Sequence, residues 1–258
     1  WLGVGTLAAG QIGSEKSGPP EPQEVREEQT AGVRSSRWFA QARGGSMTGV
    51  ALVVHGLNLN PDRMVNIIRT LNAGGIGVLQ VSLLGHGGNF TPIVGMDQAE
   101  ARMEAFKSVS YEKWAGDLLA AWRWVDQLSG QVELPLFLVA DSYGALLALE
   151  LMLTEADVQF DRMVLFAPAL SMRGRNHIIR LLNPFPGWVW PSFAPEFYRA
   201  NRGTPQAAYQ VILNTLERFE KSLGPKINVP TLVFIDPKDE LISYKGFYRC
   251  RQGSVYFG

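Results

Sequence analysis

The sequence predicts an α/β fold in which a mostly parallel sheet is flanked by helices. Short, wholly apolar runs of strand length, such as Val50–Val54, alternate with longer amphipathic segments. One such run, 134–140, is followed at once by a tight turn and an apolar helix. The chain has 258 residues, 46% of them hydrophobic and 19% charged, which is enough for one sizeable core. These features favour right-handed βαβ units in one domain.

The individual elements follow from local patterns. A helix is predicted to begin at Pro61, because proline suits the first helical position, and to end at Gly74 and Gly75. A second amphipathic helix is marked by Trp114, Leu118, Ala121, Trp122 and Val125 on one face, and a third covers 143–153. Strands are predicted at 38–42, 50–54, 76–83, 134–140, 163–166 and 230–235.

Residues 171–225 interrupt this alternation, because they separate two strands by far more than one crossover helix needs. The segment carries several prolines and a group of aromatic residues: Trp188, Trp190, Phe193, Phe197 and Tyr198. A helix is expected to follow, with Thr204 as its N-cap and Pro205 in its first turn. We expect an inserted cap over the carboxyl-terminal edge of the sheet, where ligands bind in α/β folds.

The first 36 residues are expected to lie outside the folded domain, which would span 37–258. Residues 1–10 are too short to cross a bilayer and are similar to the end of a signal-peptide core, with a disordered remnant as the alternative. Residues 14–36 are rich in Pro, Glu, Gln and Ser, as in a disordered linker. A signal peptide would imply export, or a membrane tether through residues upstream of Trp1; otherwise the protein is expected in the cytoplasm.

Composition disfavours several classes of function. Lys+Arg and Asp+Glu both number 24 and no basic stripe is present, which argues against nucleic-acid binding. The single cysteine, Cys250, rules out an intrachain disulfide within this sequence and is interpreted as incidental, although two arginines flank it. The glycine-rich loop Gly85–Gly88 lacks the spacing and the lysine of a P-loop. No metal and no cofactor is therefore expected.

Ser142 is the candidate for chemistry. It lies in the turn Ala140-Asp141-Ser142-Tyr143-Gly144, which fits the nucleophile-elbow pattern G-x-S-x-G with alanine at the first small position. Gly144 would let the following helix pack close to the strand. A serine hydroxyl is a weak nucleophile at neutral pH and needs an adjacent base. An ordinary turn serine is the alternative interpretation.

Five motifs carry a resemblance to a known family. In chain order they are Val53–Leu57, Leu84–Gly88, the elbow at Ser142, Leu165–Leu170 and Pro230–Asp239, which together extend over residues 48–242. In their order and spacing they resemble the α/β-hydrolase superfamily. Within it the sequence is similar to carboxylesterases and monoacylglycerol lipase-like enzymes, a group often labelled serine aminopeptidase-like.

The resemblance implies roles for individual residues. Ser142 would be the nucleophile and Asp239 the triad acid, with Asp236 as its competitor. The backbone N–H groups of Leu57 and Tyr143 would form the oxyanion hole. Asp141 is expected to direct its side chain away from the serine, as an elbow residue or a charge at the pocket rim. The substrate pocket is expected to include His55, Gly56, His86, Trp188, Trp190 and Phe193, with both histidines shaping loops rather than doing chemistry.

The catalytic histidine is the missing part of this pattern. The superfamily order is Ser, acid, His, yet His55, His86 and His177 all precede Asp239. We therefore expect the sequence to be truncated before its last strand and helix, with Ser254–Phe257 as the possible start of that strand. His177 could replace the base only after a large rearrangement. The chain as written is expected to be nearly inactive and its complete parent active.

The predicted function is hydrolysis of a small carboxylic ester with an apolar acyl group. The cap aromatic residues could line an acyl pocket or simply pack the cap, and the two roles are compatible. A catalytically inactive binding protein on the same scaffold is the alternative, and a peptidase or thioesterase also remains open. A dehalogenase is disfavoured, because such enzymes carry aspartate where Ser142 stands.

Overall fold

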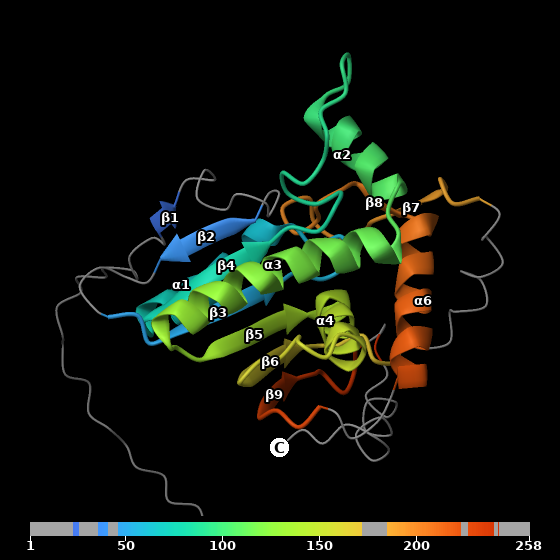
Figure 1. The fold of residues 1–258 in the computed structure, drawn as a ribbon. Coiled ribbons are helices and arrows are strands. Elements are labelled where there is room, and N and C mark those ends of the chain that lie inside the picture. Colours follow the sequence, from blue (N-terminus) through green and yellow to red (C-terminus); the bar gives the residue numbers. More distant parts are fainter. Residues whose placement is uncertain are drawn as a thin grey trace, which may run out of the picture.

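The computed structural model describes residues 23–25, 36–40, 46–171, 185–222, 227–239 and 242. Its main sheet has seven strands in the order β1-β2-β4-β3-β5-β6-β9 (Figure 1). The strands are β1 Gln23–Val25, β2 Arg37–Ala40, β3 Gly49–Val54, β4 Ile76–Val81, β5 Leu136–Asp141, β6 Arg162–Phe166 and β9 Thr231–Phe234. The predictions for residues 1–10, His177, Cys250 and Ser254–Phe257 lie outside the described residues.

Strand pairing confirms the mostly parallel sheet. The pairs β4–β3, β3–β5, β5–β6 and β6–β9 are all parallel. Only β1 and β2, at one edge, run antiparallel to their neighbours. The carboxyl-terminal ends of the parallel strands therefore meet at one edge of the sheet, where α/β folds bind their ligands.

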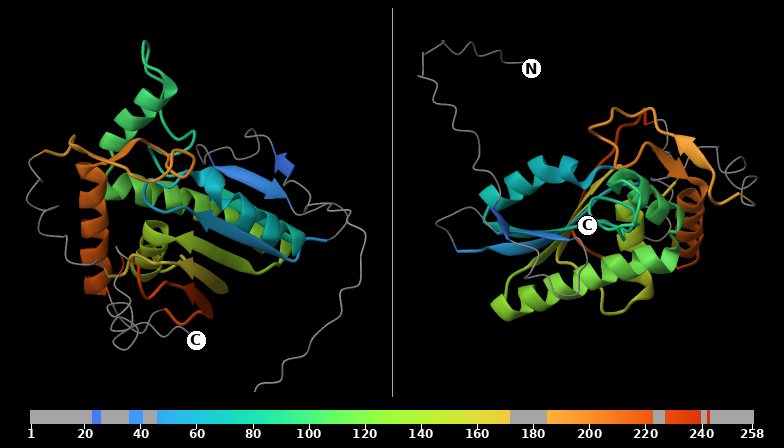
Figure 2. Two further views of the ribbon diagram at one scale, coloured as in Figure 1. Left: turned by 180° about the vertical axis from the view of Figure 1, so that it is seen from behind. Right: turned by 90° about the horizontal axis from the view of Figure 1, so that it is seen from above.

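Helices cover both faces of this sheet (Figure 2). They are α1 Val65–Ala73, α2 Gln98–Lys107, α3 Tyr111–Val132, α4 Ser142–Thr154 and α6 Gln206–Ser222, with a 3₁₀ helix η2 over Pro61–Met64 before α1. Strand β3 is buried throughout and its side chains alternate between two hydrophobic clusters. Val50, Leu52 and Val54 pack with α3 and α4, whereas Ala51 and Val53 pack on the side of α1. A strand buried on both faces reads as a continuous apolar run, as here.

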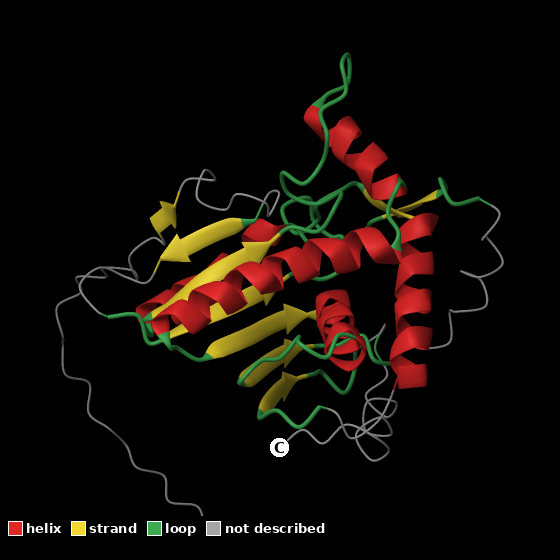
Figure 3. Ribbon diagram, viewed as in Figure 1, coloured by secondary structure: helices red, strands yellow, loops and turns green. Residues whose placement is uncertain are grey.

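The cap lies over the carboxyl-terminal ends of the strands. It contributes a two-stranded ribbon, β7 Val189–Pro191 and β8 Gly203–Pro205, and then α6, with loop between them (Figure 3). The expectation that Thr204 caps this helix is wrong, because Thr204 and Pro205 belong to β8. The N–H groups of Gln206 and Ala207 instead donate to the carbonyl groups of Trp188 and Pro186, at 2.7 and 3.0 Å. Carbonyl groups of the cap loop thus accept from the first two N–H groups of α6, which have no acceptor within the helix.

Besides the cap strands β7 and β8, the elements β1 and α2 were not predicted from the sequence. Strand β1 lies within the segment that we expected to be a linker, and it pairs with β2. Helix α2 lies between the Gly85–Gly88 loop and Trp114, in a segment for which no element was predicted, and it projects from the sheet on the side of the cap (Figure 1). Asp97 and Glu100 form a capping box at its start, in which each side chain accepts a hydrogen bond from the other residue's backbone.

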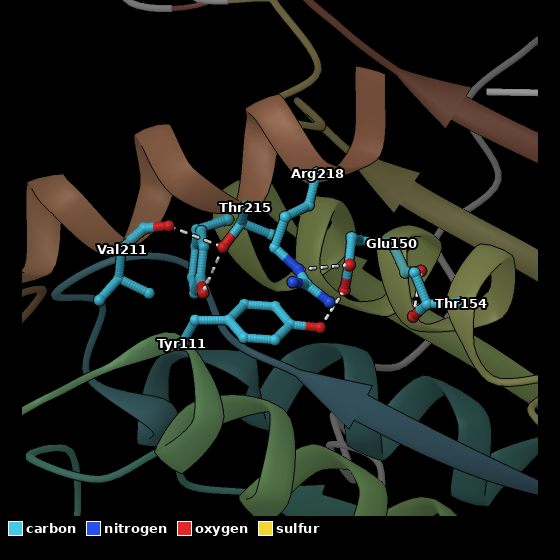
Figure 4. Close-up of polar contacts among 7 residues, drawn as sticks. Tyr111, Glu150, Thr154, Val211, Thr215 and Arg218 are labelled. Atoms are coloured by element: carbon cyan, nitrogen blue, oxygen red, sulfur yellow. Dashed lines mark hydrogen bonds and ion pairs between the residues drawn. The ribbon is translucent and has the colours of Figure 1, made fainter. Parts of the chain in front are cut away.

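A buried carboxylate joins three helices beneath the cap (Figure 4). Glu150 of α4 is fully buried and accepts hydrogen bonds from Arg218 Nε of α6, at 2.9 Å, and from the hydroxyl of Tyr111 at the start of α3. The guanidinium of Arg218 also lies 4.1 Å from the centre of the Tyr111 ring. Nearby, Thr215 donates to the carbonyl oxygen of Val211 at 2.7 Å. Because a buried charge is costly without partners, this cluster fixes α6 against α4.

None of the helices in the described part of the chain is both long enough and apolar enough to span a lipid bilayer.

Candidate active site

Ser142 occupies the sharp bend between β5 and α4. Strand β5 ends at Asp141, helix α4 begins at Ser142, and Ser142 has a φ of 47°. A left-handed φ costs a residue other than glycine about 1–2 kcal/mol, so the surrounding structure must hold it there. One restraint is the N–H of Ala169, which donates to the carbonyl oxygen of Ser142 at 3.1 Å. This is the strand–turn–helix geometry that the sequence pattern predicts.

Two glycines allow the backbone to close around this serine. A Cβ on Gly144 would lie 2.5 Å from the carbonyl oxygen of His55 and 3.1 Å from that of Val54. A Cβ on Gly56 would lie 3.1 Å from the Cβ of Ser142 and would overlap the carboxylate of Asp141. The loop after β3 therefore touches the elbow directly: a side chain at 144 would collide with backbone atoms, and one at 56 would have to displace the carboxylate of Asp141.

The contact brings two backbone donors beside Ser142. Tyr143 lies in the first turn of α4, where N–H groups have no acceptor within the helix. Leu57 follows Gly56 in the loop, and its N–H has no acceptor among the described residues. His55 Nδ1 bonds the carbonyl oxygen of Gly56 at 2.8 Å, which fixes the Gly56–Leu57 peptide plane. In a trans peptide the N–H points opposite to the C=O, so His55 orients the N–H of Leu57.

The two described histidines, His55 and His86, are buried scaffold residues. Nε2 of His55 accepts from the N–H of Leu83 and Nε2 of His86 accepts from that of Asn58, both at 3.1 Å. Each ring therefore carries its proton on Nδ1. The centres of the two rings are 4.5 Å apart. Burial lowers the pKa of His55 to about 4 and also lowers that of His86. With both nitrogens engaged, neither imidazole is available to Ser142.

The acidic side of the site comes from the loop after β9. Asp239 accepts a hydrogen bond from the N–H of Ile242 at 2.7 Å, whereas exposed Asp236 accepts one from Lys238 in its own turn at 2.8 Å. Burial, and secondly the charge of Asp239, raise the pKa of Asp141 to about 6. Asp141 and Asp239 are therefore close enough to interact electrostatically beside the elbow. No metal-binding group of three or more His, Cys, Asp or Glu residues occurs in the described part of the chain.

The cap aromatic residues predicted for the pocket differ in their surroundings. Nε1 of Trp190 donates to Gln206 at 2.9 Å and its ring meets Tyr209 edge-on, so Trp190 packs the cap against α6. Trp188 and Phe193 are 57% and 97% exposed. A cavity of about 550 Å³ lies between α2 and the cap, lined by charged residues of both signs, and Ser142 is not among its lining residues. An apolar pocket built from Trp188, Trp190 and Phe193 stays a prediction.

Sequence reasoning did not identify Asn58 and Asn201. Both are buried, and they join the loop after β3 to the cap through hydrogen bonds that span 143 residues of sequence. No motif marks either residue. The one local signal is that asparagine tolerates a left-handed backbone, which Asn58 adopts with a φ of 52°.

Known structures share this architecture at low sequence identity. A soluble variant of monoglyceride lipase from Saccharomyces cerevisiae matches 95% of this chain and 85% of its own, with a TM-score of 0.69 and 11% identity. A carboxyl esterase from Bacillus coagulans matches 86% and 82%, with a TM-score of 0.61 and 15% identity. A monoacylglycerol lipase from Paleococcus ferrophilus matches 82% and 83%, with a TM-score of 0.59 and 19% identity. These similarities show the α/β-hydrolase fold.

Sequence comparison gives the family. A search of curated protein sequences finds no match. The family model described as "Serine aminopeptidase, S33" matches residues 45–211, which is more than half of the chain and includes both the loop after β3 and the bend at Ser142. The chain therefore belongs to the serine aminopeptidase S33 family of α/β-hydrolases.

Proposed function

We propose that this protein is a serine hydrolase that cleaves small carboxylic esters through an acyl-enzyme on Ser142. The observation that carries the proposal is the placement of Ser142 at a left-handed bend at the carboxyl-terminal end of β5. The N–H groups of Leu57 and Tyr143 lie on the two segments that meet there. A serine with an amide donor on each adjoining segment supplies two of the parts that acyl transfer needs, and the third is a general base.

The reaction would proceed in two steps. The Oγ of Ser142 attacks the ester carbonyl as its proton passes to a histidine base, and the two N–H groups stabilise the oxyanion, each by about 3 kcal/mol. The C–O bond to the alcohol then breaks, and the histidine returns the proton to the leaving alkoxide. Water, activated by the same base, hydrolyses the acyl-enzyme and restores the hydroxyl of Ser142.

Asp239 is the acid that fits this scheme. Its charge acts on Asp141, next to the nucleophile, whereas the carboxylate of Asp236 is exposed and caps its own turn. The base is neither His55 nor His86, since both ring nitrogens of each are engaged with the scaffold. Two sources remain for it: His177, or a histidine that follows Asp239 in a longer form of the protein.

The proposed substrate class is an ester with an apolar acyl group. The similar structures include a monoglyceride lipase with a bound substrate analogue and a carboxyl esterase with bound glycerol. Exposed Trp188 and Phe193 of the cap offer the apolar surface that an acyl chain needs. Because the family description names an aminopeptidase, cleavage of an aminoacyl amide is the second candidate activity.

The test compares hydrolysis of a p-nitrophenyl acyl ester and of an aminoacyl p-nitroanilide. It uses residues 1–258, any longer natural form, and the Ser142→Ala variant of each. The proposal predicts ester turnover in a form that carries a histidine after Asp239, and a loss of at least roughly a thousandfold in Ser142→Ala. Robust turnover by residues 1–258 that also depends on Ser142 would instead assign the base to His177. Anilide turnover alone would favour the peptidase, and no Ser142-dependent turnover in any form would favour a binding protein.

A further inference from the structure

We infer that Asn58 is a positioning residue that couples the cap to the oxyanion hole, so that Leu57 is held in its working orientation only while the cap is docked. The inference rests on the proposed function for its consequence, because the coupling matters through the Leu57 N–H. Its structural basis is a continuous set of buried hydrogen bonds between residues far apart in sequence.

Leu57 is fixed from both sides by the stacked histidine pair. The peptide before it is held because His55 bonds the carbonyl oxygen of Gly56. The peptide after it is held because the N–H of Asn58 donates to Nε2 of His86 at 3.1 Å. Leu57 is thus restrained on one side through His55 and on the other through Asn58, and the orientation of its N–H depends on both restraints.

Asn58 in turn is fixed by the cap. Its carbonyl oxygen accepts from the N–H of Ala200 and its Oδ1 accepts from the N–H of Asn201, both at 2.9 Å. Its Nδ2 donates to the carbonyl groups of Asn201 and Gly203, at 3.0 and 3.3 Å. Every polar atom of Asn58 therefore has a partner, and all of these partners except His86 belong to the cap.

The neighbouring residues extend this attachment. The N–H of Asn60 donates to the carbonyl oxygen of Tyr198 at 2.8 Å, and Leu59 forms a β-bridge with Arg199. The side chain of Asn201 reaches the loop before His86, where its Nδ2 donates to the carbonyl oxygen of Gly85 at 2.8 Å. The cap segment 198–203 thus contacts both loops that hold the histidine pair.

This buried network of hydrogen bonds has few arrangements between the fully bonded state and the fully separated one. Asn58 and Asn201 are 7% and 4% exposed, so separation of the cap would leave several donors and acceptors without partners. The left-handed φ of Asn58 would also lose the contacts that hold it. A displaced cap is therefore expected to release the Leu57–Asn58 segment as well, and substrate bound beneath a docked cap meets an ordered oxyanion hole.

The test uses variants that remove the cap contacts of Asn58 and preserve its backbone bonds. Asn58→Gly accepts the φ and removes all three side-chain hydrogen bonds. Asn58→Asp keeps the backbone restraint and the Oδ1 acceptor but loses the two Nδ2 bonds. The matched control is Asn72→Ala in α1, which removes a buried asparagine whose side chain binds only the carbonyl groups of Phe39 and Ile76.

Two readouts are compared in the form of the protein that shows Ser142-dependent ester turnover. Both Asn58 variants are expected to lower kcat at least tenfold with KM changed less than threefold, because the oxyanion donor acts on the transition state. They are also expected to raise amide hydrogen exchange in 57–60 and 198–203 together. Asn72→Ala is expected to change kcat less than twofold and to leave exchange in both segments unaltered.

An unchanged kcat in a variant whose cap segment exchanges faster would overturn the coupling. So would faster exchange at 198–203 with unchanged exchange at 57–60. If no form shows Ser142-dependent turnover, the proposed function fails, and the exchange result alone decides whether the two segments move as one unit. If Asn58→Gly does not fold, Asn58→Asp alone decides, since it too removes the Nδ2 bonds to the carbonyl groups of Asn201 and Gly203 and carries the same expected outcomes.

Discussion

The imidazole of His55 bonds the carbonyl oxygen of Gly56 at 2.8 Å, and this bond restrains the peptide plane that carries the N–H of Leu57. His55 is fully buried at the end of β3, and its other nitrogen accepts the N–H of Leu83. A histidine that might be mistaken for a catalytic base thus has a different role. It restrains the peptide that carries the N–H of Leu57, the donor that we propose for the oxyanion hole.

Replacing His55 tests this role directly. The Nδ2 of asparagine can occupy the place of Nδ1, so His55→Asn keeps a donor for the carbonyl oxygen of Gly56, whereas His55→Leu keeps none. We expect His55→Leu to lower kcat by about a hundredfold, in line with loss of one oxyanion donor, and His55→Asn to lower it clearly less. Steady-state ester hydrolysis at a temperature where both variants are folded measures the difference. Equal losses in the two variants would contradict the orienting role.

Asp141 should destabilise the folded protein at neutral pH. Burial and the charge of Asp239 raise its pKa from 3.8 to about 6, so the folded state holds the proton longer than the unfolded chain does. Relative to the ionised carboxylate, the stability that the protonated carboxyl contributes is fully present below pH 3.8 and is lost as the pH rises through about 6.

Asp141→Asn, which cannot ionise, is therefore expected to raise the free energy of unfolding by about 2 kcal/mol near pH 8, and by less than half of that near pH 4.5. Urea denaturation at both pH values measures the gain. The exposed Asp126 gives the control Asp126→Asn, for which we expect a change within about 0.5 kcal/mol. A gain in stability that is absent at pH 8, or that grows as the pH falls, would refute the raised pKa of Asp141.

Gly144 is expected to tolerate no side chain. The carbonyl oxygens of His55 and Val54 lie 2.5 and 3.1 Å from where a Cβ would stand, and both are backbone atoms. Gly144→Ala should therefore lower the free energy of unfolding by about 2–3 kcal/mol or more, as overpacking does. Gly116→Ala in α3 is the control, because its Cβ would meet nothing within 4 Å and should add up to about 1 kcal/mol of helix stability. Chemical denaturation of both variants makes the comparison, and a Gly144→Ala protein of wild-type stability would contradict the close contact.

The Glu150–Arg218 pair anchors α6 and can be tested by removing its partners in turn. Glu150 is fully buried and Arg218 is half exposed, so Arg218→Met should strand a buried charge and cost about 2 kcal/mol of stability. Adding Glu150→Gln should recover most of that loss, because the remaining amide is neutral. Lys107→Met breaks a partly exposed pair with Glu104 and should cost no more than about 0.5 kcal/mol. Thermal unfolding of the three variants measures these differences in stability. A double variant that is less stable than Arg218→Met would contradict the role of Arg218 as the partner of the buried Glu150 charge.

The elements that carry Ser142 could be predicted because their signals are local. Strand β5 is an apolar run, the elbow needs small residues at fixed positions, and Gly144 marks the close helix contact. Helix α2 was missed because its apolar residues do not form a stripe, although the Asp97–Glu100 capping box marked its start. Hydrophobic periodicity detects a buried face, and α2 has only a small one.

The rest of the site depends on contacts that no sequence pattern encodes. Asn58 and Asn201 are two asparagines among many until the fold brings them together across 143 residues. Thr204-Pro205 looks like a helix start, yet tertiary pairing with β7 makes it a strand. The neutral state of His55 likewise follows from burial, which the sequence suggests only through its neighbours.

The central claim is that the hydroxyl of Ser142 is the nucleophile, and covalent trapping tests it most directly. Protein in the form that shows ester turnover is treated with a fluorophosphonate, digested, and analysed by mass spectrometry. We predict a single phosphonyl adduct on the peptide that contains Ser142, with turnover lost in step with labelling, and neither adduct nor turnover in Ser142→Ala. Ester hydrolysis that survives Ser142→Ala, or an adduct on another residue of the active enzyme, would contradict the account.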